Sequence, residues 1–195
     1  MARPQKYNRE MVLDSAMKLF WLKGYANTSM KDLTKVTKLQ PGSLYGAFES
    51  KRNLFLLSLD YYFENLYASA KSILVSDEAP LKRIRLFFNY ILTQKNEDKE
   101  LKSCLLMNTL LEISPDDNEI NQRVQFMFAN IEQEISRVLE QARSNGSLIA
   151  GARPESIAKM LMSGIFGLQV YNRLKSDQDS LVQIVNNLLA NIEKT

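Results

Sequence analysis

The chain has 195 residues, of which 45% are hydrophobic and 24% are charged, as is typical of a globular protein with its own core. It contains one cysteine and no histidine. An internal disulfide framework is therefore excluded, and the commonest general base and metal ligand are missing. No apolar stretch is long enough to cross a bilayer, and the N-terminus has no apolar signal-peptide core. The composition predicts a cytoplasmic, non-enzymatic protein with no cofactor, no metal and no membrane partner.

Charge is distributed unevenly along the chain. Residues 1–52 hold ten Lys/Arg and four Asp/Glu, a net charge of +6, whereas residues 53–195 have a net charge of −3. A basic segment of this kind favours an anionic partner. A chance surface bias would give the same distribution, so charge alone does not decide between the two interpretations.

The first fifty residues predict three short helices. Asn8 is a suitable N-cap for the first helix, and a glycine follows its expected end. Thr28 or Ser29 is a suitable N-cap for the second helix, and Asp32 can complete a capping box from Ser29. Gln40 can occupy the N-cap of the third helix, because Pro41 favours the first helical position. These signals predict a helix-turn-helix unit within Thr28–Lys51.

The third of these helices has an unusual exposed face. Leu44 and Phe48 face inward at i, i+4 spacing, which leaves residues 42, 43, 45 and 46 facing out. Two glycines in so short a helix cost about 1 kcal/mol each relative to alanine. Small residues permit close approach of another surface, so the pattern favours a helix that is pressed against a ligand. A three-helix unit without a ligand would leave an exposed tyrosine between two glycines unexplained.

A helix-turn-helix brings the N-terminal residues of its second helix nearest to the base edges of DNA. Gln40 can pair bidentately with adenine, and Ser43 can bond to a base or a phosphate. The other predicted contacts position the unit on the DNA backbone. The complete predicted DNA-binding set is Thr28, Ser29, Lys38, Gln40, Pro41, Gly42, Ser43, Tyr45, Gly46 and Lys51.

The stretch TSMKDLTKVTKLQPGSLYGAFESKRNLF resembles the DNA-binding signature of the tetracycline-repressor (TetR) family of bacterial transcriptional regulators. The core of the signature is present as Ser43, Leu44, Tyr45, Phe48, Ser50 and Lys51. The resemblance covers about residues 8–56. It departs from the family at Lys38, where a turn glycine is usual, and at Asn53, where a capping glutamate is usual. The resemblance implies a homodimer, a palindromic double-stranded DNA operator, and an unknown small-molecule effector that releases the DNA.

The remaining sequence predicts further helices and no alternating strand pattern, so the expected fold class is all-α. Helices are expected over residues 53–76, 81–94, 101–113, 119–145, 155–174 and 179–192. We assign residues 1–52 to a three-helix helix-turn-helix head. Residues 53–195 are assigned to a C-terminal helical-bundle domain for effector binding and dimerisation.

The last two predicted helices each carry an apolar stripe with small residues beside the first stripe. Such a pair can complete its own domain core or form half of an intermolecular four-helix bundle. The predicted dimerisation residues are Ile157, Leu161, Gly164, Ile165, Leu168, Leu181, Ile184, Val185, Leu188 and Leu189.

Cys104 lies in the helix predicted over 101–113 and shares a face with Asn108 and Glu112. The segments SCLLMNTLLEISPDDNEI and GLQVYNRL resemble one subgroup of the TetR family. The resemblance implies that a cysteine here sometimes senses oxidants or electrophiles. A small buried apolar role is the preferred interpretation, because free cysteines are commonly buried and no histidine is available to activate the thiol. The predicted effector or sensor residues are Cys104, Met107, Asn108, Leu111, Glu112, Phe126 and Phe166.

Three functions fit these observations: a ligand-released repressor, a helical sensor that acts through a protein partner, and a non-specific basic DNA binder. Operator sequence, regulated genes and effector are not encoded in any recognisable motif, and activation in place of repression also stays open.

Overall fold

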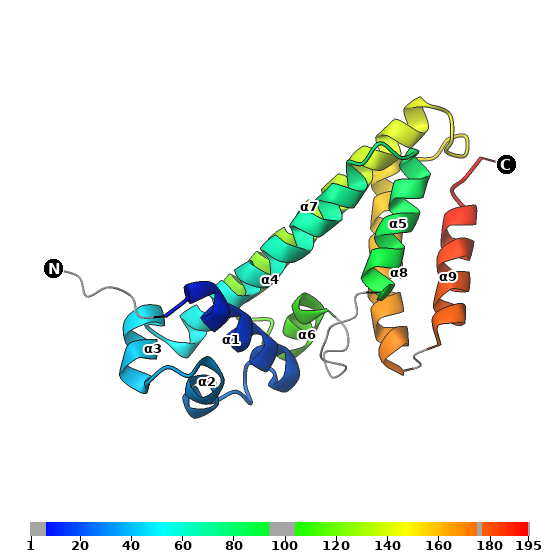
Figure 1. The fold of residues 1–195 in the computed structure, drawn as a ribbon. Coiled ribbons are helices and arrows are strands. Elements are labelled where there is room, and N and C mark those ends of the chain that lie inside the picture. Colours follow the sequence, from blue (N-terminus) through cyan, green and yellow to red (C-terminus); the bar gives the residue numbers. More distant parts are fainter. Residues whose placement is uncertain (1–6, 94–103, 175–176, 195) are drawn as a thin grey trace. The chain divides into compact units, whose positions relative to one another are not determined.

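The computed structural model describes residues 7–93, 104–174 and 177–194, and it is built from α-helices (Figure 1). Among the described residues, the β pairing consists of one isolated bridge between Leu148 and Glu193. The predicted all-α class is confirmed. The helices are α1 (Arg9–Lys23), α2 (Met30–Thr37), α3 (Pro41–Phe48), α4 (Lys51–Leu74), α5 (Pro80–Thr93), α6 (Leu105–Glu112), α7 (Asn118–Ser144), α8 (Pro154–Leu174) and α9 (Gln178–Ala190).

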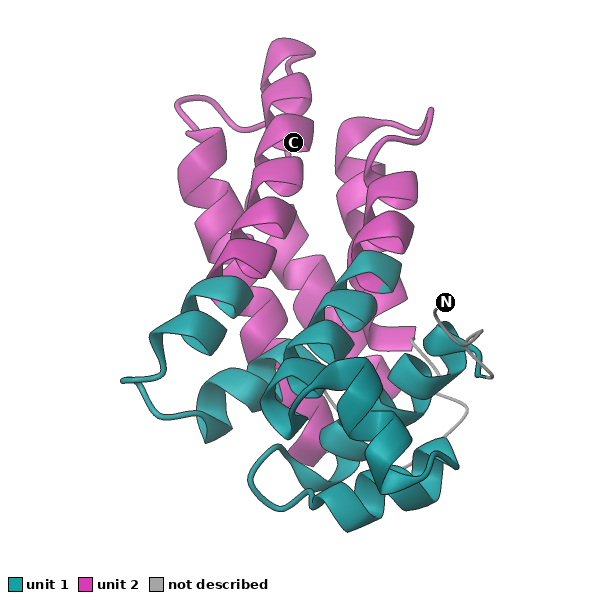
Figure 2. Cartoon of the chain, turned by 90° about the vertical axis from the view of Figure 1, so that its left-hand side faces the viewer, with its two compact units in different colours: residues 1–65, 104–124 teal, residues 66–103, 125–195 magenta. Residues whose placement is uncertain are grey.

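The chain divides into two compact units, and neither is a continuous segment (Figure 2). Unit 1 comprises Met1–Asn65 and Cys104–Val124, and unit 2 comprises Leu66–Ser103 and Gln125–Thr195. Helices α4 and α7 therefore contribute residues to both units. This division differs from the boundary at residue 52 that the sequence predicts, because α6 and the first turns of α4 and α7 pack with the helix-turn-helix.

The predicted ends of the first helices are confirmed. The Asn8 side chain accepts the backbone N–H groups of Glu10 (2.9 Å) and Met11 (3.2 Å). Gly24 follows α1 with φ of 80° and donates its N–H to the carbonyl of Phe20. These interactions use backbone groups that the helix itself leaves unpaired.

The cap of α2 is the predicted capping box. The backbone N–H of Asp32 donates to the Ser29 hydroxyl (3.1 Å), and the backbone N–H of Ser29 donates to the Asp32 carboxylate (3.0 Å). The Asp32 carboxylate also accepts the Ser29 hydroxyl and lies 3.0 Å from Lys23 Nζ, and these contacts hold the pKa of Asp32 well below its usual range. The start of α2 is therefore fixed by charge as well as by hydrogen bonds.

Unit 1 has a continuous aromatic and aliphatic core. Phe20 packs edge-on against Phe55, with 4.9 Å between ring centroids, and Trp21 packs edge-on against Tyr62 at 5.0 Å. These two pairs join α1 to α4. Within the helix-turn-helix, the fully buried apolar side chains are Leu33, Leu44 and Phe48.

Unit 2 buries a guanidinium group. Arg83 of α5 donates from Nη1 to the carbonyl of Leu74 (2.9 Å) at the end of α4, and from Nη2 to Gln141 of α7. Its Nε has no partner among the described atoms. On the same helices α4 and α7, the Tyr67 hydroxyl donates to the carboxylate of Glu134 (2.6 Å), which holds the pKa of Tyr67 above its usual range. These bonds connect α4, α5 and α7.

The stripes on α8 and α9 pack inside one chain. Seven of the ten residues predicted to form the dimer interface are buried in unit 2: Ile157, Leu161, Ile165, Leu168, Leu181, Val185 and Leu189. A Cβ on Gly164 would lie 2.9 Å from Leu188 Cδ1, so this glycine allows α8 to approach α9 closely. Ile184 and Leu188 are half-buried.

The predicted stripes therefore form part of the core of unit 2, because α8 and α9 turn their widest apolar faces toward neighbouring helices of the same chain. The apolar side chains that stay exposed on α8 and α9 are Met160, Val170, Leu174 and Val182. Within the described ranges, none of the helices is both long enough and apolar enough to span a membrane.

Candidate nucleic-acid interface

Helices α2 and α3 form the predicted helix-turn-helix. Lys38 ends α2 in the left-handed conformation, with φ of 58° and ψ of 19°, at the position where the family usually has glycine. Gln40 is extended, and Pro41 begins α3. A left-handed non-glycine residue costs about 1–2 kcal/mol, so the tight turn is kept despite an unfavourable residue.

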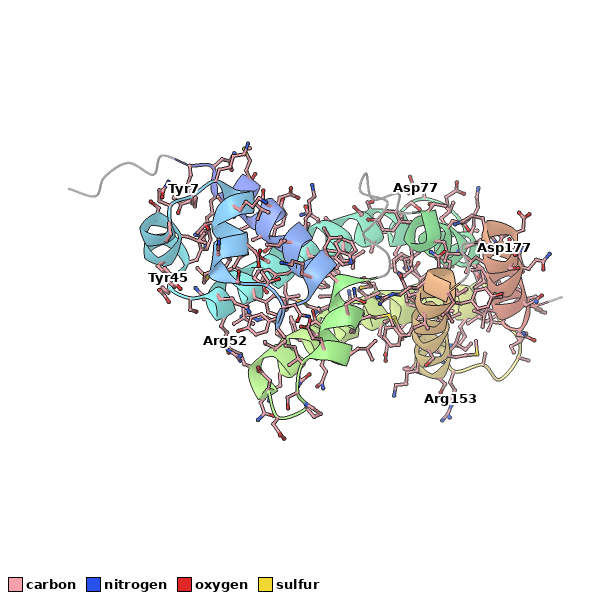
Figure 3. The ribbon with its side chains drawn as sticks, turned by 90° about the horizontal axis from the view of Figure 1, so that it is seen from below. Tyr7, Tyr45, Arg52, Asp77, Arg153 and Asp177 are labelled. Atoms are coloured by element: carbon pink, nitrogen blue, oxygen red, sulfur yellow. The ribbon has the colours of Figure 1, made fainter. Side chains whose placement is uncertain are left out.

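The outward face of α3 is exposed as predicted. Gln40, Pro41, Gly42, Ser43 and Gly46 are exposed, and Tyr45 retains 47% of its accessible surface (Figure 3). Leu44 and Phe48 on the opposite side are fully buried. The polar and small residues of α3 therefore lie on one surface.

The two glycines of α3 are not required by packing within the chain. A Cβ placed on Gly42 or Gly46 would meet no atom within 4 Å among the described residues. Alanine at either position would also favour the helix by about 1 kcal/mol. Packing among the described residues therefore does not account for glycine at these two positions, which leave open space on the exposed side of α3.

Helix α3 ends in a strained turn. Glu49 has φ of 64° and ψ of −50°, and the N–H of Ser50 donates to the carbonyl of Phe48 at 2.6 Å. This is the rare γ-turn with positive φ, which is unfavourable for a residue with a Cβ. The segment that contains α3 is therefore flanked by two non-glycine residues with positive φ, Lys38 before it and Glu49 after it.

Two of the predicted DNA contacts have other roles. Thr28 is 1% exposed, and its hydroxyl donates to the carbonyl of Gly24 (2.6 Å). The Thr28 side chain therefore braces the turn before α2, and its contact with DNA stays a prediction. The hydroxyl of Ser29 is engaged in the capping box with Asp32.

Lys51 begins α4 and points back to the turn before α2. Its Nζ lies 4.4 Å from the centroid of the Tyr25 ring and donates to the carbonyl of Ala26 (3.5 Å). The lysine is half-buried. Its ammonium group is therefore held at the edge of the helix-turn-helix, where a phosphate contact from this residue is predicted.

Arg52, the next residue, is labelled in Figure 3. It forms ion pairs with both Asp117 and Glu119. Its Nη1 and Nη2 donate to the two carboxylate oxygens of Asp117, both at 2.7 Å, and Nε and Nη2 donate to Glu119 at 3.1 and 2.9 Å. The guanidinium group of Arg52 holds the pKa of Asp117 below its usual range. No local pattern of residues indicates this ion pair, because the two carboxylates lie 65 and 67 residues from Arg52 in sequence.

Glu112 has a structural contact that the predicted effector role did not anticipate. Its carboxylate accepts the backbone N–H groups of Tyr25 (2.9 Å) and Ala26 (2.7 Å). Both belong to the turn between α1 and α2. The side chain therefore holds the turn that precedes the helix-turn-helix, and its role in effector binding stays a prediction.

Cys104 is the N-cap of α6 and precedes the helix; residues 101–103 of the predicted helix lie outside the described residues. The thiol is buried, with Sγ 3.6 Å from the Tyr62 hydroxyl, and burial raises its pKa. A raised pKa disfavours the reactive thiolate. The structure thus supports the preferred small apolar role.

The other predicted effector residues are divided between the two units. Met107 and Asn108 are half-buried in unit 1, whereas Leu111 is 77% exposed. In unit 2, Phe126 is 67% exposed and Phe166 packs edge-on against Phe128.

Two family models match the chain. Residues 12–57 match the model of bacterial regulatory proteins of the tetR family, and residues 80–188 match the tetracyclin repressor-like C-terminal domain. The repressor ComR of Escherichia coli is 28% identical over 188 residues, which cover 96% of this chain and 90% of ComR. The repressor DhaR of a Mycobacterium species is 21% identical, with 91% of this chain and 88% of DhaR covered.

Solved structures of the family have the same fold. A cysteine-substituted form of the regulator CifR, in complex with 26-base-pair operator DNA, superposes with a TM-score of 0.87 at 22% identity, covering 98% of this chain and all of that one. The reduced form of NemR from Escherichia coli gives 0.85 at 20% identity, covering 94% and 96%. The protein is thus an all-α transcriptional regulator with an N-terminal helix-turn-helix. The chain belongs to the tetR family of bacterial regulatory proteins.

Proposed function

We propose that the protein is a cytoplasmic transcriptional repressor that binds a palindromic operator as a homodimer and releases it when a small-molecule effector binds the C-terminal helices. The observation that carries DNA binding is the exposed face of α3. It combines residues suited to base edges with two glycines that no contact among the described residues requires. The similarity to ComR and DhaR, which are both transcriptional repressors, supports repression.

Base reading is assigned to the first turn of α3. Gln40 reads adenine, and Pro41, Gly42 and Ser43 line the groove edge. The backbone contacts are assigned to Tyr45, Lys51 and Lys38, all of which are exposed or half-buried. The backbone N–H groups at the start of α2, near Ser29, provide a further place for a phosphate.

A titration of one operator duplex against a random duplex, at several salt concentrations, tests the function. The operator is obtained by sequencing DNA fragments that the purified protein retains. Binding of the operator should exceed that of random DNA by roughly a thousandfold or more. Equal binding of the two duplexes would instead support a non-specific DNA binder, and no binding of either would support a sensor that acts through a protein.

Gly46→Ala separates the role of α3 in DNA binding from its role in folding. The added methyl group meets no described atom and favours the helix by about 1 kcal/mol. We therefore expect a protein that is at least as stable but binds the operator more weakly. Unfolding in urea and the operator titration, carried out on one preparation, measure both effects. Unchanged affinity would show that DNA does not approach α3 closely.

Base and phosphate contacts are distinguished by their dependence on sequence. Tyr45→Phe and Lys51→Ala should weaken binding to all duplexes, whereas Gln40→Ala should relax the preference at one base pair by about 1–3 kcal/mol. A panel of operators with single base changes provides the measurement.

Dimerisation is assigned to α8 and α9, through the side chains that these helices leave exposed: Met160, Val170, Leu174 and Val182. Ile184 and Leu188, which are half-buried, follow Val182 along α9. Leu174→Glu should shift the protein to a monomer in analytical ultracentrifugation, because it sets two charges against an apolar interface. A dimer of unchanged stability would exclude Leu174 from the interface.

A further inference from the structure

Charged side chains hold the turn before α2 at both its N–H groups and its carbonyl. Glu112, the last residue of α6, accepts the N–H groups of Tyr25 (2.9 Å) and Ala26 (2.7 Å). Lys51, the first residue of α4, donates to the carbonyl of Ala26 (3.5 Å) and lies 4.4 Å from the centroid of the Tyr25 ring. One dipeptide therefore connects a carboxylate of α6 to the lysine assigned to a DNA phosphate.

Gly24 makes room for this carboxylate. It has φ of +80°, and a Cβ built on it would lie 2.7 to 2.9 Å from the Glu112 carboxylate. Successive backbone N–H groups in a turn can form a concave site for an anion. In this chain the anion is the side chain of Glu112, which is 86 to 87 residues distant in sequence.

We propose that Glu112 is a positioning residue for DNA binding. Its carboxylate fixes the Tyr25–Ala26 turn, and the turn fixes Lys51 Nζ for its phosphate. Hydrogen bonds to an ionised acceptor are about twice as strong as neutral ones, and α6 belongs to the same compact unit as the helix-turn-helix. The inference rests on the DNA-binding function proposed above, and Glu112 acts through Lys51 without touching DNA.

The sign of the effect distinguishes positioning from general electrostatics. Removing a carboxylate from a protein that binds a polyanion should tighten binding at every site. If Glu112 positions Lys51, Glu112→Gln should weaken binding instead, because glutamine keeps one acceptor oxygen and has no charge. Asp116→Asn is the matched control, since it removes the same charge from an exposed position of the same chain segment.

Operator affinity is measured for the parent, Glu112→Gln, Asp116→Asn, Lys51→Ala and the double variant of Glu112 and Lys51, each over a range of salt. Glu112→Gln should weaken binding on the order of tenfold, as expected for one charge-assisted hydrogen bond. Its salt slope should fall by about 0.9 for each phosphate that the variant no longer neutralises. The double variant should bind no more weakly than Lys51→Ala, and Asp116→Asn should bind as tightly as the parent or more tightly.

Glu112→Asp provides a second test that keeps the charge. A side chain shorter by one methylene does not reach both N–H groups, so positioning predicts weaker binding, and a pure charge effect predicts parental binding. Exchange of the Tyr25 and Ala26 amide protons should be faster in both Glu112 variants, whereas thermal midpoints show that they are folded.

The proposal is overturned if Glu112→Gln tightens binding as Asp116→Asn does, or if the effects of the Glu112 and Lys51 substitutions add in full. A parent protein that does not prefer its operator refutes the proposed function instead. The two failures are thus separate.

Discussion

The ion pair of Arg52 provides the sharpest test of how unit 1 is held together. Arg52→Met keeps the apolar stem and removes the charge, which leaves Asp117 and Glu119 without their common partner. Asp117 retains the backbone N–H of Ile120 (3.3 Å), and both carboxylates lie at the N-terminal end of α7, which favours negative charge. Neither carboxylate is therefore left uncompensated.

The side chains of Arg52 and Asp117 are 39% and 21% exposed, so solvent screens much of their attraction. Exposed pairs contribute about 0.2–1 kcal/mol, and bidentate geometry in a network favours the upper end of that range. We therefore expect Arg52→Met to lower the free energy of unfolding by about 1 kcal/mol. In a double-mutant cycle with Asp117→Asn, most of this loss should appear as coupling.

Urea unfolding at fixed protein concentration gives these free energies, and their pH dependence gives a second result. Arg52 lowers the folded-state pKa of Asp117. The added stability is therefore fully present above the ordinary aspartate pKa of about 4 and is lost as the pH falls through the lower folded value. The difference between parent and variant should shrink in that acid range. Zero coupling at pH 7, or a difference that does not depend on pH, would refute the role given to Arg52.

Three further changes test single features of unit 1. Glu49→Gly should raise the free energy of unfolding by about 1 kcal/mol, because glycine accepts the positive φ without strain; a loss of stability in urea would contradict this. Leu44→Ala should lower it by about 2–5 kcal/mol, since the side chain is fully buried, and a smaller loss would mean that the core refills the cavity. Cys104→Ser and the parent should respond alike to oxidant in an operator-binding assay, because the parent thiol is buried and its pKa is raised. Release of the operator by the parent alone would establish Cys104 as a sensor.

Local features of the head were predictable from sequence. The Asn8 cap, the Ser29 capping box and the start of α3 at Pro41 depend on residues at most three positions apart, so the side-chain chemistry alone fixes them. The exposed face of α3 followed from two buried positions, Leu44 and Phe48.

Contacts between distant segments were not predictable. Helical periodicity identified the apolar faces of α8 and α9, but it does not specify which surface covers each face. Leu161 and Leu181 therefore fitted an intermolecular bundle as well as the domain core that they occupy. The sequence around Glu112 and Asp117 does not indicate their contacts, because their partners in the head lie 65 to 87 residues away.

The discontinuous course of unit 1 has a consequence for how the protein folds during synthesis. The helices α1 to α3 leave the ribosome long before Glu112 and Asp117, at about 5–20 residues per second. The turn at Tyr25–Ala26 and the start of α4 at Arg52 gain their carboxylate partners only after the chain has been made beyond Glu119. A nascent chain that carries the helix-turn-helix alone is thus incomplete. We expect such a chain, cut after residue 65, to gain native-like protection at Tyr25 only when residues 104–124 are supplied.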